Sequence, residues 1–266
     1  ISPPRVRSNP MDSKLIFNFK KDISGVKIPD QLNNPFGIDI PEIVDIAARE
    51  FQGFITSVSP EWVYDFDVRK GKMFGILVVQ KVDNDYAYLG TVSGRLARKT
   101  VCDNFVPSVF NDSVDDYFMD KGMTELTEMS NTINQSNNQD EISSLTVSRK
   151  QKSLALQQRL FENYHFLNVL GQEKSVWQIF KESVHSNPPS AAGECAAPKL
   201  LQYAFKYQLK PIALAEFWWG NPSKNKKREH KAFYPACKDK CRPILEYMLD
   251  DKDLFNLAHP EQLKEP

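Results

Sequence analysis

The sequence predicts an α/β chain of the α+β kind, with a mixed sheet, flanking helices and a helical insertion that interrupts it. Three apolar runs, 73–79, 86–92 and 212–219, have the length and composition of strands. Segments with helical spacing flank these runs, and a polar, helical stretch separates the second run from the third. With 266 residues, 41% of them hydrophobic, the chain can bury the core of one large domain or two small ones.

The first part of the chain contains an arm, a helix and a hairpin. Residues 1–30 are polar with little periodicity, so we expect a flexible N-terminal arm. A helix begins at Pro41, because the N–H that proline lacks would have no partner in a first turn. The runs 73–79 and 86–92 are separated by a short polar turn, which favours an antiparallel hairpin. We therefore expect residues 31–112 to form the first half of the α/β domain.

Residues 113–190 differ in kind and are expected to form a helical insertion. Helical patterns cover 115–129 and 147–166, and a shorter one covers 175–182. Between the first two lies the amide-rich tract 130–139. Because this tract has too little apolar surface to order itself, it predicts a polar Asn/Gln linker within the insertion.

Residues 191–250 are expected to complete the domain. A helix starts near Pro198, a buried strand covers 212–219, and a last helix covers 243–249. The residues after Asp250 are mostly polar and charged, so 251–266 are expected to be a C-terminal tail.

One group of side chains in this second half has the residue types of a metal site. Cys195 lies just ahead of the expected helix, and Cys237 and Cys241 precede the last one, with His230 seven residues before Cys237. Thiolates and an imidazole in a set of four suit tetrahedral zinc, so these residues are candidate ligands of a structural zinc. The C-x-x-x-C spacing also fits buried, unligated thiols beside an exposed His230. No other cofactor is expected.

The formal net charge is zero, with 34 basic and 34 acidic residues, so any nucleic-acid surface must be local. One loop has the required mixture, since basic side chains beside aromatic rings hold phosphates and stack unpaired bases. The alternative is a solvated loop with its aromatic rings turned inward. The candidate RNA-binding residues are Lys224, Lys226, Lys227, Arg228, Lys231, Trp219 and Tyr234.

Four unevenly spaced cysteines do not form the pattern of a disulfide framework, which favours a reducing compartment, and the expected location is the cytoplasm. No apolar run approaches the 18 residues or more that a membrane span needs, so no membrane association is expected.

The order of elements, with a Cys-led helix, a strand and a Pro-x-Cys-x-x-x-Cys segment entering a helix, resembles the cytidine-deaminase fold. That resemblance implies a zinc site with a glutamate two residues after the first ligand to move protons. Here Ala197 stands at that position, and the second motif carries one extra residue. If the fold is deaminase-like, we expect a catalytically dead scaffold. A zinc-dependent deaminase-like enzyme remains the alternative.

A second resemblance covers most of the chain. The phrases PFGIDIPEIVDIAAREFQGFI, GKMFGILVVQ, YLGTVSGRL, NFVPSVF, LFENYHFLNVLG, GECAAPKLLQYAF, KPIALAEFWWG and YPACKDKCRPILEYML follow one another from about residue 35 to residue 249. Together they resemble the N-terminal accessory region of bacterial RluA-type pseudouridine synthases. The resemblance implies a C-terminal synthase domain as partner and structured ribosomal or transfer RNA as the target in which that isomerase converts uridine to pseudouridine without a cofactor.

The catalytic aspartate of that family lies in a Gly-Arg-Leu-Asp signature. The Gly-Arg-Leu at 94–96 is followed by Ala97, after a predicted strand and in the wrong region, so no catalytic residue can be assigned. The sequence ends at Pro266, before a catalytic domain. We therefore expect this segment to position RNA or the catalytic domain and to perform no chemistry alone. An interaction domain that binds protein is the remaining alternative.

Overall fold

The computed structural model describes residues 12–58, 71–94, 103–110, 118–184, 186–222 and 228–250. The chain divides into two compact units. The first contains residues 1–108, 166–173 and 189–266, and the second contains 109–165 and 174–188. The six α-helices and the strands of the described residues give the α+β class that the sequence predicts. Several predictions fall outside the described ranges, namely the Gly-Arg-Leu-Ala tetrapeptide beyond Gly94, the extreme N-terminal arm and the tail 251–266.

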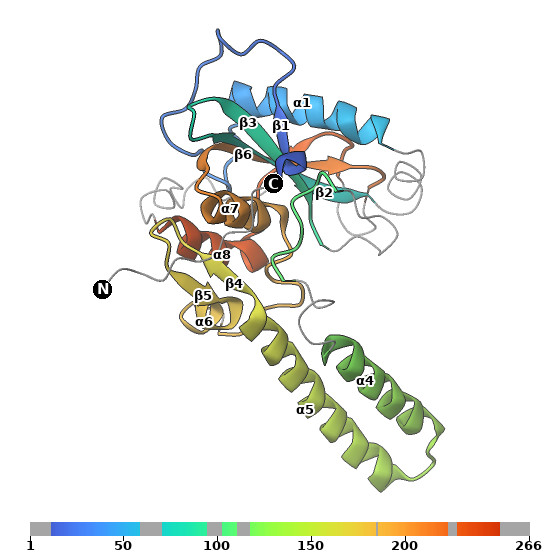
Figure 1. Cartoon of the computed structure of the whole chain (residues 1–266). Coiled ribbons are helices and arrows are strands. Elements are labelled where there is room, and N and C mark those ends of the chain that lie inside the picture. The colour runs from blue at the N-terminus through green and yellow to red at the C-terminus, as the bar shows by residue number, and fades with distance from the viewer. Residues whose placement is uncertain are drawn as a thin grey trace, which may run out of the picture. The chain divides into compact units, whose positions relative to one another are not determined.

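The first unit is built on a five-stranded sheet with the order β1-β3-β2-β6-β7 (Figure 1). The predicted hairpin is confirmed as β2 (Lys72–Gln80) and β3 (Tyr86–Val92), and β6 (Lys210–Trp219) pairs with the other side of β2. All neighbouring strands of this sheet pair antiparallel, so the expectation of a mixed sheet was wrong for the described strands. The long connection between β3 and β6 allows β6 to enter in either direction, and the sequence pattern does not encode which.

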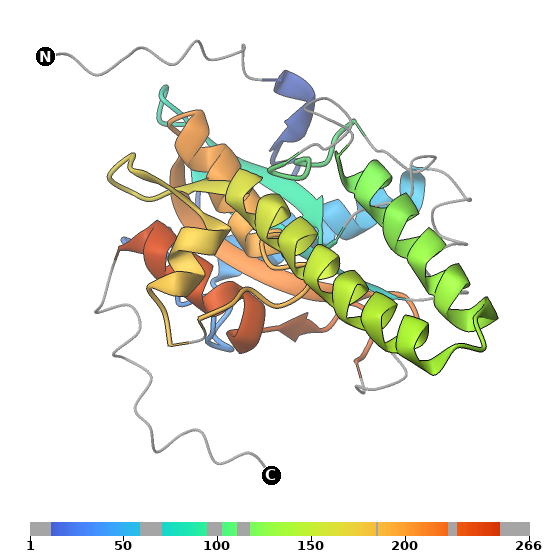
Figure 2. The same ribbon diagram turned by 90° about the horizontal axis from the view of Figure 1, so that it is seen from below.

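Helix α1 (Glu42–Ser57) covers one face of the sheet, and α7 (Ala196–Lys206) lies on the other (Figures 1 and 2). Pro41 is the N-cap of α1, as expected of a proline at a helix start. The side chains of β2 alternate between the two faces, so Phe74, Ile76 and Val78 pack in one cluster with the buried face of α1. Gly90 of β3 leaves room for the ring of Phe51, which a Cβ would overlap.

The structure corrects the expected N-terminal arm. Residues 13–15 form a short 3₁₀ turn, and β1 (Ile16–Asn18) pairs with β3 at the edge of the sheet. Phe17 stacks on Tyr88 with ring centroids 5.3 Å apart. A strand of three residues has no readable period, so only its long-range partner shows that it belongs to the sheet.

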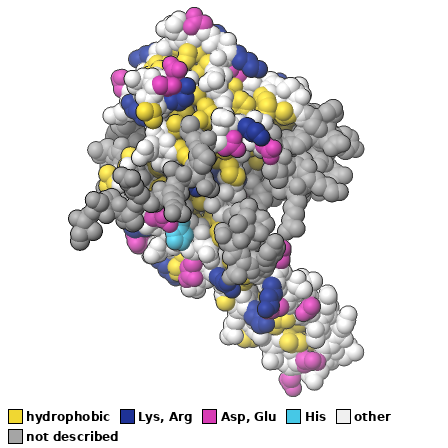
Figure 3. Space-filling model, viewed as in Figure 1, with side chains coloured by type: hydrophobic (Ala, Val, Ile, Leu, Met, Phe, Trp, Pro, Cys, Tyr) yellow, Lys and Arg dark blue, Asp and Glu magenta, His cyan; other side chains and the backbone are white. Residues whose placement is uncertain are grey.

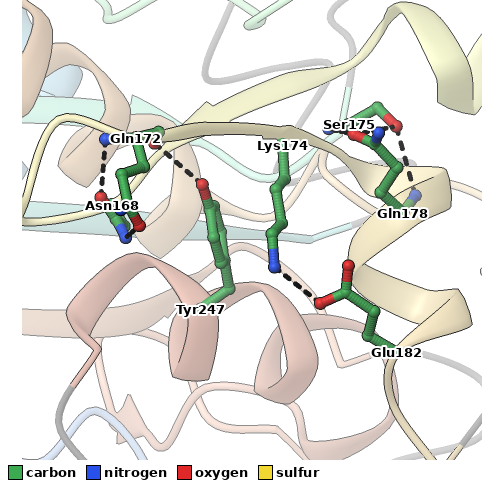
Figure 4. Close-up of polar contacts among 7 residues, drawn as sticks. All are labelled: Asn168, Gln172, Lys174, Ser175, Gln178, Glu182 and Tyr247. Carbon is green, nitrogen blue, oxygen red and sulfur yellow. Dashed lines mark hydrogen bonds and ion pairs between the residues drawn. The ribbon is translucent and has the colours of Figure 1, made fainter.

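Helix α8 (Lys238–Leu249) packs against α7 in the first unit (Figure 2). It begins one turn earlier than expected, and Pro243 lies inside it. The segment 166–173 belongs to the same unit and is tied to α8: Val169 donates its N–H to the Met248 carbonyl at 2.8 Å, and the Tyr247 hydroxyl donates to the Gln172 carbonyl at 2.8 Å (Figure 4). These bonds fix the far end of α8.

The second unit contains the antiparallel helices α4 (Phe118–Gln135) and α5 (Gln139–Asn163). The predicted Asn/Gln linker 130–139 is therefore largely helical, with a loop of only 136–138. Pairing between the helices overrides the weak helix propensity of the tract, since Arg149 Nε donates to the Ser130 hydroxyl at 2.7 Å. In the face shown in Figure 3, this helical pair carries acidic and basic side chains interspersed among uncharged ones.

Two short strands, β4 (His165–Leu167) and β5 (Glu173–Ser175), pair with each other. Helix α6 (Val176–Lys181) follows, and Ser175 begins it with a reciprocal capping box to Gln178 (Figure 4). Lys174 forms an exposed ion pair with Glu182 at 2.6 Å. No helix among the described residues is both long enough and apolar enough for a membrane span.

Candidate metal centre

Three cysteines that are distant in the sequence lie together in the first unit. Cys195 is the N-cap of α7, Cys237 is the N-cap of α8, and Cys241 follows one turn later in α8. Their sulfur atoms all lie within 4.8 Å of one another, and the Sγ atoms of Cys237 and Cys241 are 3.3 Å apart. All three are free thiols, of which Cys241 is buried and Cys237 is the most exposed.

The start of α7 is fixed by a side chain just after β3 and by one from β6. The Ala196 N–H donates to the Ser93 hydroxyl at 3.1 Å, and the Ala197 N–H donates to Glu216 Oε1 at 3.0 Å. Pro198 has no N–H to satisfy, and the Cys195 side chain makes no capping bond. Because other groups satisfy these helix donors, the Cys195 sulfur is available to the cluster.

A buried ion pair ties the same region to the end of β3. Lys199 is 3% exposed, and its Nζ donates to the carbonyls of Val92 and Gly94, each at 3.0 Å. The Lys199 Nζ also lies 3.3 Å from Glu194 Oε2, while Glu194 Oε1 accepts a hydrogen bond of 2.5 Å from the Ser108 hydroxyl. Glu194 directly precedes Cys195, so this ion pair fixes the backbone next to the first thiol.

The three thiols share protons unequally. Hydrogen bonds from Cys195 and then Cys241 lower the pKa of Cys237, with further help from the backbone N–H groups of Lys240 and Cys241. The hydrogen bond with Cys237 raises the pKa of Cys195, and the bond with Cys195 raises the pKa of Cys241. Cys237 is therefore the first of the three to become a thiolate, which is the form that binds metal.

Glu216 is a buried carboxyl that interacts electrostatically with these thiols. It lies on β6, is 5% exposed, and burial raises its pKa to about 7. Its negative charge also contributes to the raised pKa of Cys195 and of Cys241. Neither its contact with Ala197 nor this coupling can be predicted from the sequence, where the signal is a lone carboxyl in an otherwise apolar strand.

The donor set fits a thiophilic metal such as zinc. In a tetrahedral site with Zn–S bonds of about 2.3 Å, two sulfur ligands lie about 3.8 Å apart, close to the spacing of these thiols. The fourth expected ligand, His230, is not in the cluster. Its Nδ1 accepts a hydrogen bond of 2.9 Å from the Gly220 N–H, and its ring lies against Trp219. Within the described part of the chain, the cluster therefore contains three ligands.

No protein family, curated protein or solved structure matches this chain.

The candidate RNA-binding residues are only partly described. Lys224, Lys226 and Lys227 lie outside the described residues. The Arg228 guanidinium lies 4.9 Å above the Trp218 ring and 5.4 Å above the Tyr234 ring. The exposed Lys231 places its Nζ 5.4 Å from the Trp219 ring.

Trp219 is only 3% exposed and belongs to the core cluster on the α1 face. Its ring has little surface left to stack a base. Tyr234 is half-buried, and its hydroxyl accepts a hydrogen bond of 2.7 Å from the Glu229 N–H. The described aromatic rings of this loop thus turn mostly inward, and its basic side chains are the accessible part.

Proposed function

We propose that this chain is a zinc-held accessory region of an RluA-type pseudouridine synthase, which positions structured RNA for a catalytic domain and performs no chemistry alone. In this proposal the unit keeps a deaminase-like element order as a scaffold, and the protein works in the reducing cytoplasm, where its thiols stay reduced and able to bind metal. The partner is the C-terminal synthase domain, which would convert uridine to pseudouridine.

The observation that carries the proposal is the convergence of the phrases on which the resemblance rests. GECAAPKLLQYAF contributes Cys195 and α7, and YPACKDKCRPILEYML contributes Cys237, Cys241 and α8. KPIALAEFWWG is β6 with Glu216, and GKMFGILVVQ contains all of β2. Phrases that are dispersed along the sequence therefore build one packed site, as expected of a domain that keeps them for a shared structural reason.

Zinc content tests the metal part of the proposal. Purified protein should contain one zinc per chain by mass spectrometry of the metals, and Cys195→Ser, Cys237→Ser and Cys241→Ser should each lower that content and the melting temperature. His230→Ala is the matched control, because His230 lies outside the cluster. It should retain the metal. A wild-type protein that binds no zinc would remove this part.

RNA binding tests the positioning role. The chain should bind structured ribosomal and transfer RNA with an affinity that falls as salt rises. The double variant Lys226→Glu/Lys227→Glu should weaken binding by about tenfold or more, because two favourable phosphate contacts become repulsive.

The control for that experiment carries the same change of net charge elsewhere. Lys27→Glu/Lys150→Glu alters two exposed lysines outside the loop and should leave RNA affinity unchanged. If the protein has no affinity for RNA, or if the two double variants behave alike, the RNA-contact role is wrong and an interaction with the synthase domain becomes the better proposal.

A further inference from the structure

The ligand count at the metal centre leaves one coordination position without a protein donor among the described residues. Three sulfur atoms lie within 4.8 Å of one another, and His230 is engaged by the Gly220 N–H. Zinc in proteins is almost always four-coordinate, and sites with three protein ligands keep the fourth position for an exchangeable ligand. A purely structural site usually has four protein ligands.

Glu216 lies at the helix start that carries the first of these thiols. Its Oε1 atom accepts the N–H of Ala197, two residues beyond Cys195, which places the carboxyl at the start of the helix that Cys195 caps. Within the described residues this is the one hydrogen bond of the Glu216 side chain, and it leaves Oε2 with acceptor capacity.

The location of this carboxyl is costly for a domain that needs only stability. Glu216 is 5% exposed in a strand whose other residues from Ile212 to Trp219 are all apolar and buried. Burying a carboxyl with a single hydrogen bond is unfavourable, and such groups concentrate at binding and catalytic sites. Capping α7 alone would not need a charged group, because a neutral amide oxygen accepts the same bond.

We propose that the metal held by Cys195, Cys237 and Cys241 keeps its fourth position for a small exchangeable ligand, and that Glu216 borders this position and favours neutral, proton-donating ligands over anions. The inference rests on the proposed metal centre and adds a small-molecule binding site to it. The ligand class is a small neutral oxygen or nitrogen donor with a proton to share, since a second negative charge beside Glu216 and the thiolates is repelled.

Cobalt substitution tests this site without any assay of activity. Metal-free protein is titrated with Co²⁺, whose visible absorption reports thiolate ligation and coordination number. Azide is then the anionic probe and hydroxylamine the neutral, proton-donating probe. For wild-type protein we expect one bound Co²⁺ and a saturable spectral change with each probe. Glu216→Gln, which keeps the acceptor for Ala197, should bind azide about tenfold more tightly and hydroxylamine more weakly.

Glu42→Gln is the control, because Glu42 is an exposed carboxyl in the first turn of α1, on the face of the sheet opposite α7. It should leave the preference between the probes unchanged. If Glu216→Gln does not fold, wild-type protein alone still tests the proposal, because hydroxylamine must then displace azide from the bound cobalt.

The failures are distinguishable. Absence of bound Co²⁺ removes the metal centre of the proposed function and this inference with it. Bound Co²⁺ whose spectrum responds to neither probe overturns the exchangeable position while the structural metal stands. A response that is identical in wild type and Glu216→Gln overturns the role of Glu216.

Discussion

Gly75 of β2 lies directly against Ala196 of α7: a Cβ added to Gly75 would be 2.7 Å from the Ala196 Cβ and 3.0 Å from Leu200 Cδ1. The helix that carries Cys195 at its N-cap therefore packs on the central strand at backbone distance. A side chain at position 75 would have to push this helix, and the first thiol with it, away from the sheet.

Gly75→Ala should accordingly destabilise the protein by about 1–3 kcal/mol, the usual cost of overpacking a core. It should also weaken zinc affinity in a competition with a chromophoric chelator. Gly53→Ala is the control of opposite sign, because Gly53 is exposed on α1 and a Cβ there meets nothing within 4 Å. That variant should stabilise by about 0.5–1 kcal/mol. Equal effects of the two would contradict the close approach.

Lys199 and Glu194 should be strongly coupled, because both are buried and each loses its opposite charge when the other is replaced. Lys199→Met should cost about 3–5 kcal/mol of unfolding free energy, whereas Lys199→Met/Glu194→Gln should cost less than the sum of the single changes. Urea unfolding of the four proteins measures the coupling. The exposed pair Lys174 and Glu182 serves for comparison, and Lys174→Met should cost less than about 1 kcal/mol. Additive losses at the buried pair would refute the coupling.

Asn33 acts as a substitute strand partner for β6. Its amide donates to the Leu214 carbonyl at 2.9 Å, and its carbonyl oxygen accepts the Leu214 N–H at 2.8 Å. Asn33→Ala leaves both backbone groups of Leu214 without this partner, so we expect a loss of about 2–3 kcal/mol in chemical denaturation. Asn137→Ala, an exposed asparagine in the loop between α4 and α5, should change stability by less than about 0.5 kcal/mol.

Glu216 should make the metal-free protein less stable as the pH rises. Its pKa is raised from 4.5 to about 7, so between these values the folded state binds more protons than the unfolded state. Its contribution is fully present below pH 4.5 and is lost as the pH passes 7. Since one pKa unit corresponds to about 1.4 kcal/mol, the loss is on the order of 3 kcal/mol. Unfolding free energies of wild type and Glu216→Gln, measured across this pH range, report this loss. If the two free energies depend on pH in the same way, Glu216 does not cause the loss.

The sequence predicts the hairpin, α1, α7 and β6 well, because each has an apolar period or a proline at its start. It predicts α8 one turn late, since Pro243 looks like a helix start and instead lies within the helix. The strand β1 was missed because three residues carry no pattern of their own. Its place in the sheet depends on contacts with β3, far away in the sequence.

The candidate site was predictable in part for the same reason. Cysteines at helix starts are readable, and their convergence follows from how α7 and α8 pack. His230 was included on sequence proximity to Cys237, but its ring turns toward Gly220 and Trp219. The partnership of Glu216 with Ala197 joins a strand to a helix start, and no local pattern in the sequence encodes it.

The two caps, Cys195 and Cys237, lie on either side of β6 in the sequence. A metal bound by both would cross-link the chain on the two sides of β6, so that the closed segment contains a strand that pairs with the middle of the sheet. Such a clip reduces the entropy of the unfolded chain, and its binding free energy adds to the free energy of folding. Metal binding would then depend on the pairing of β6 with the sheet, because chains in which β6 has not paired could not bring the three sulfur ligands together. A chelator that removes the metal would shift the protein toward the unfolded state.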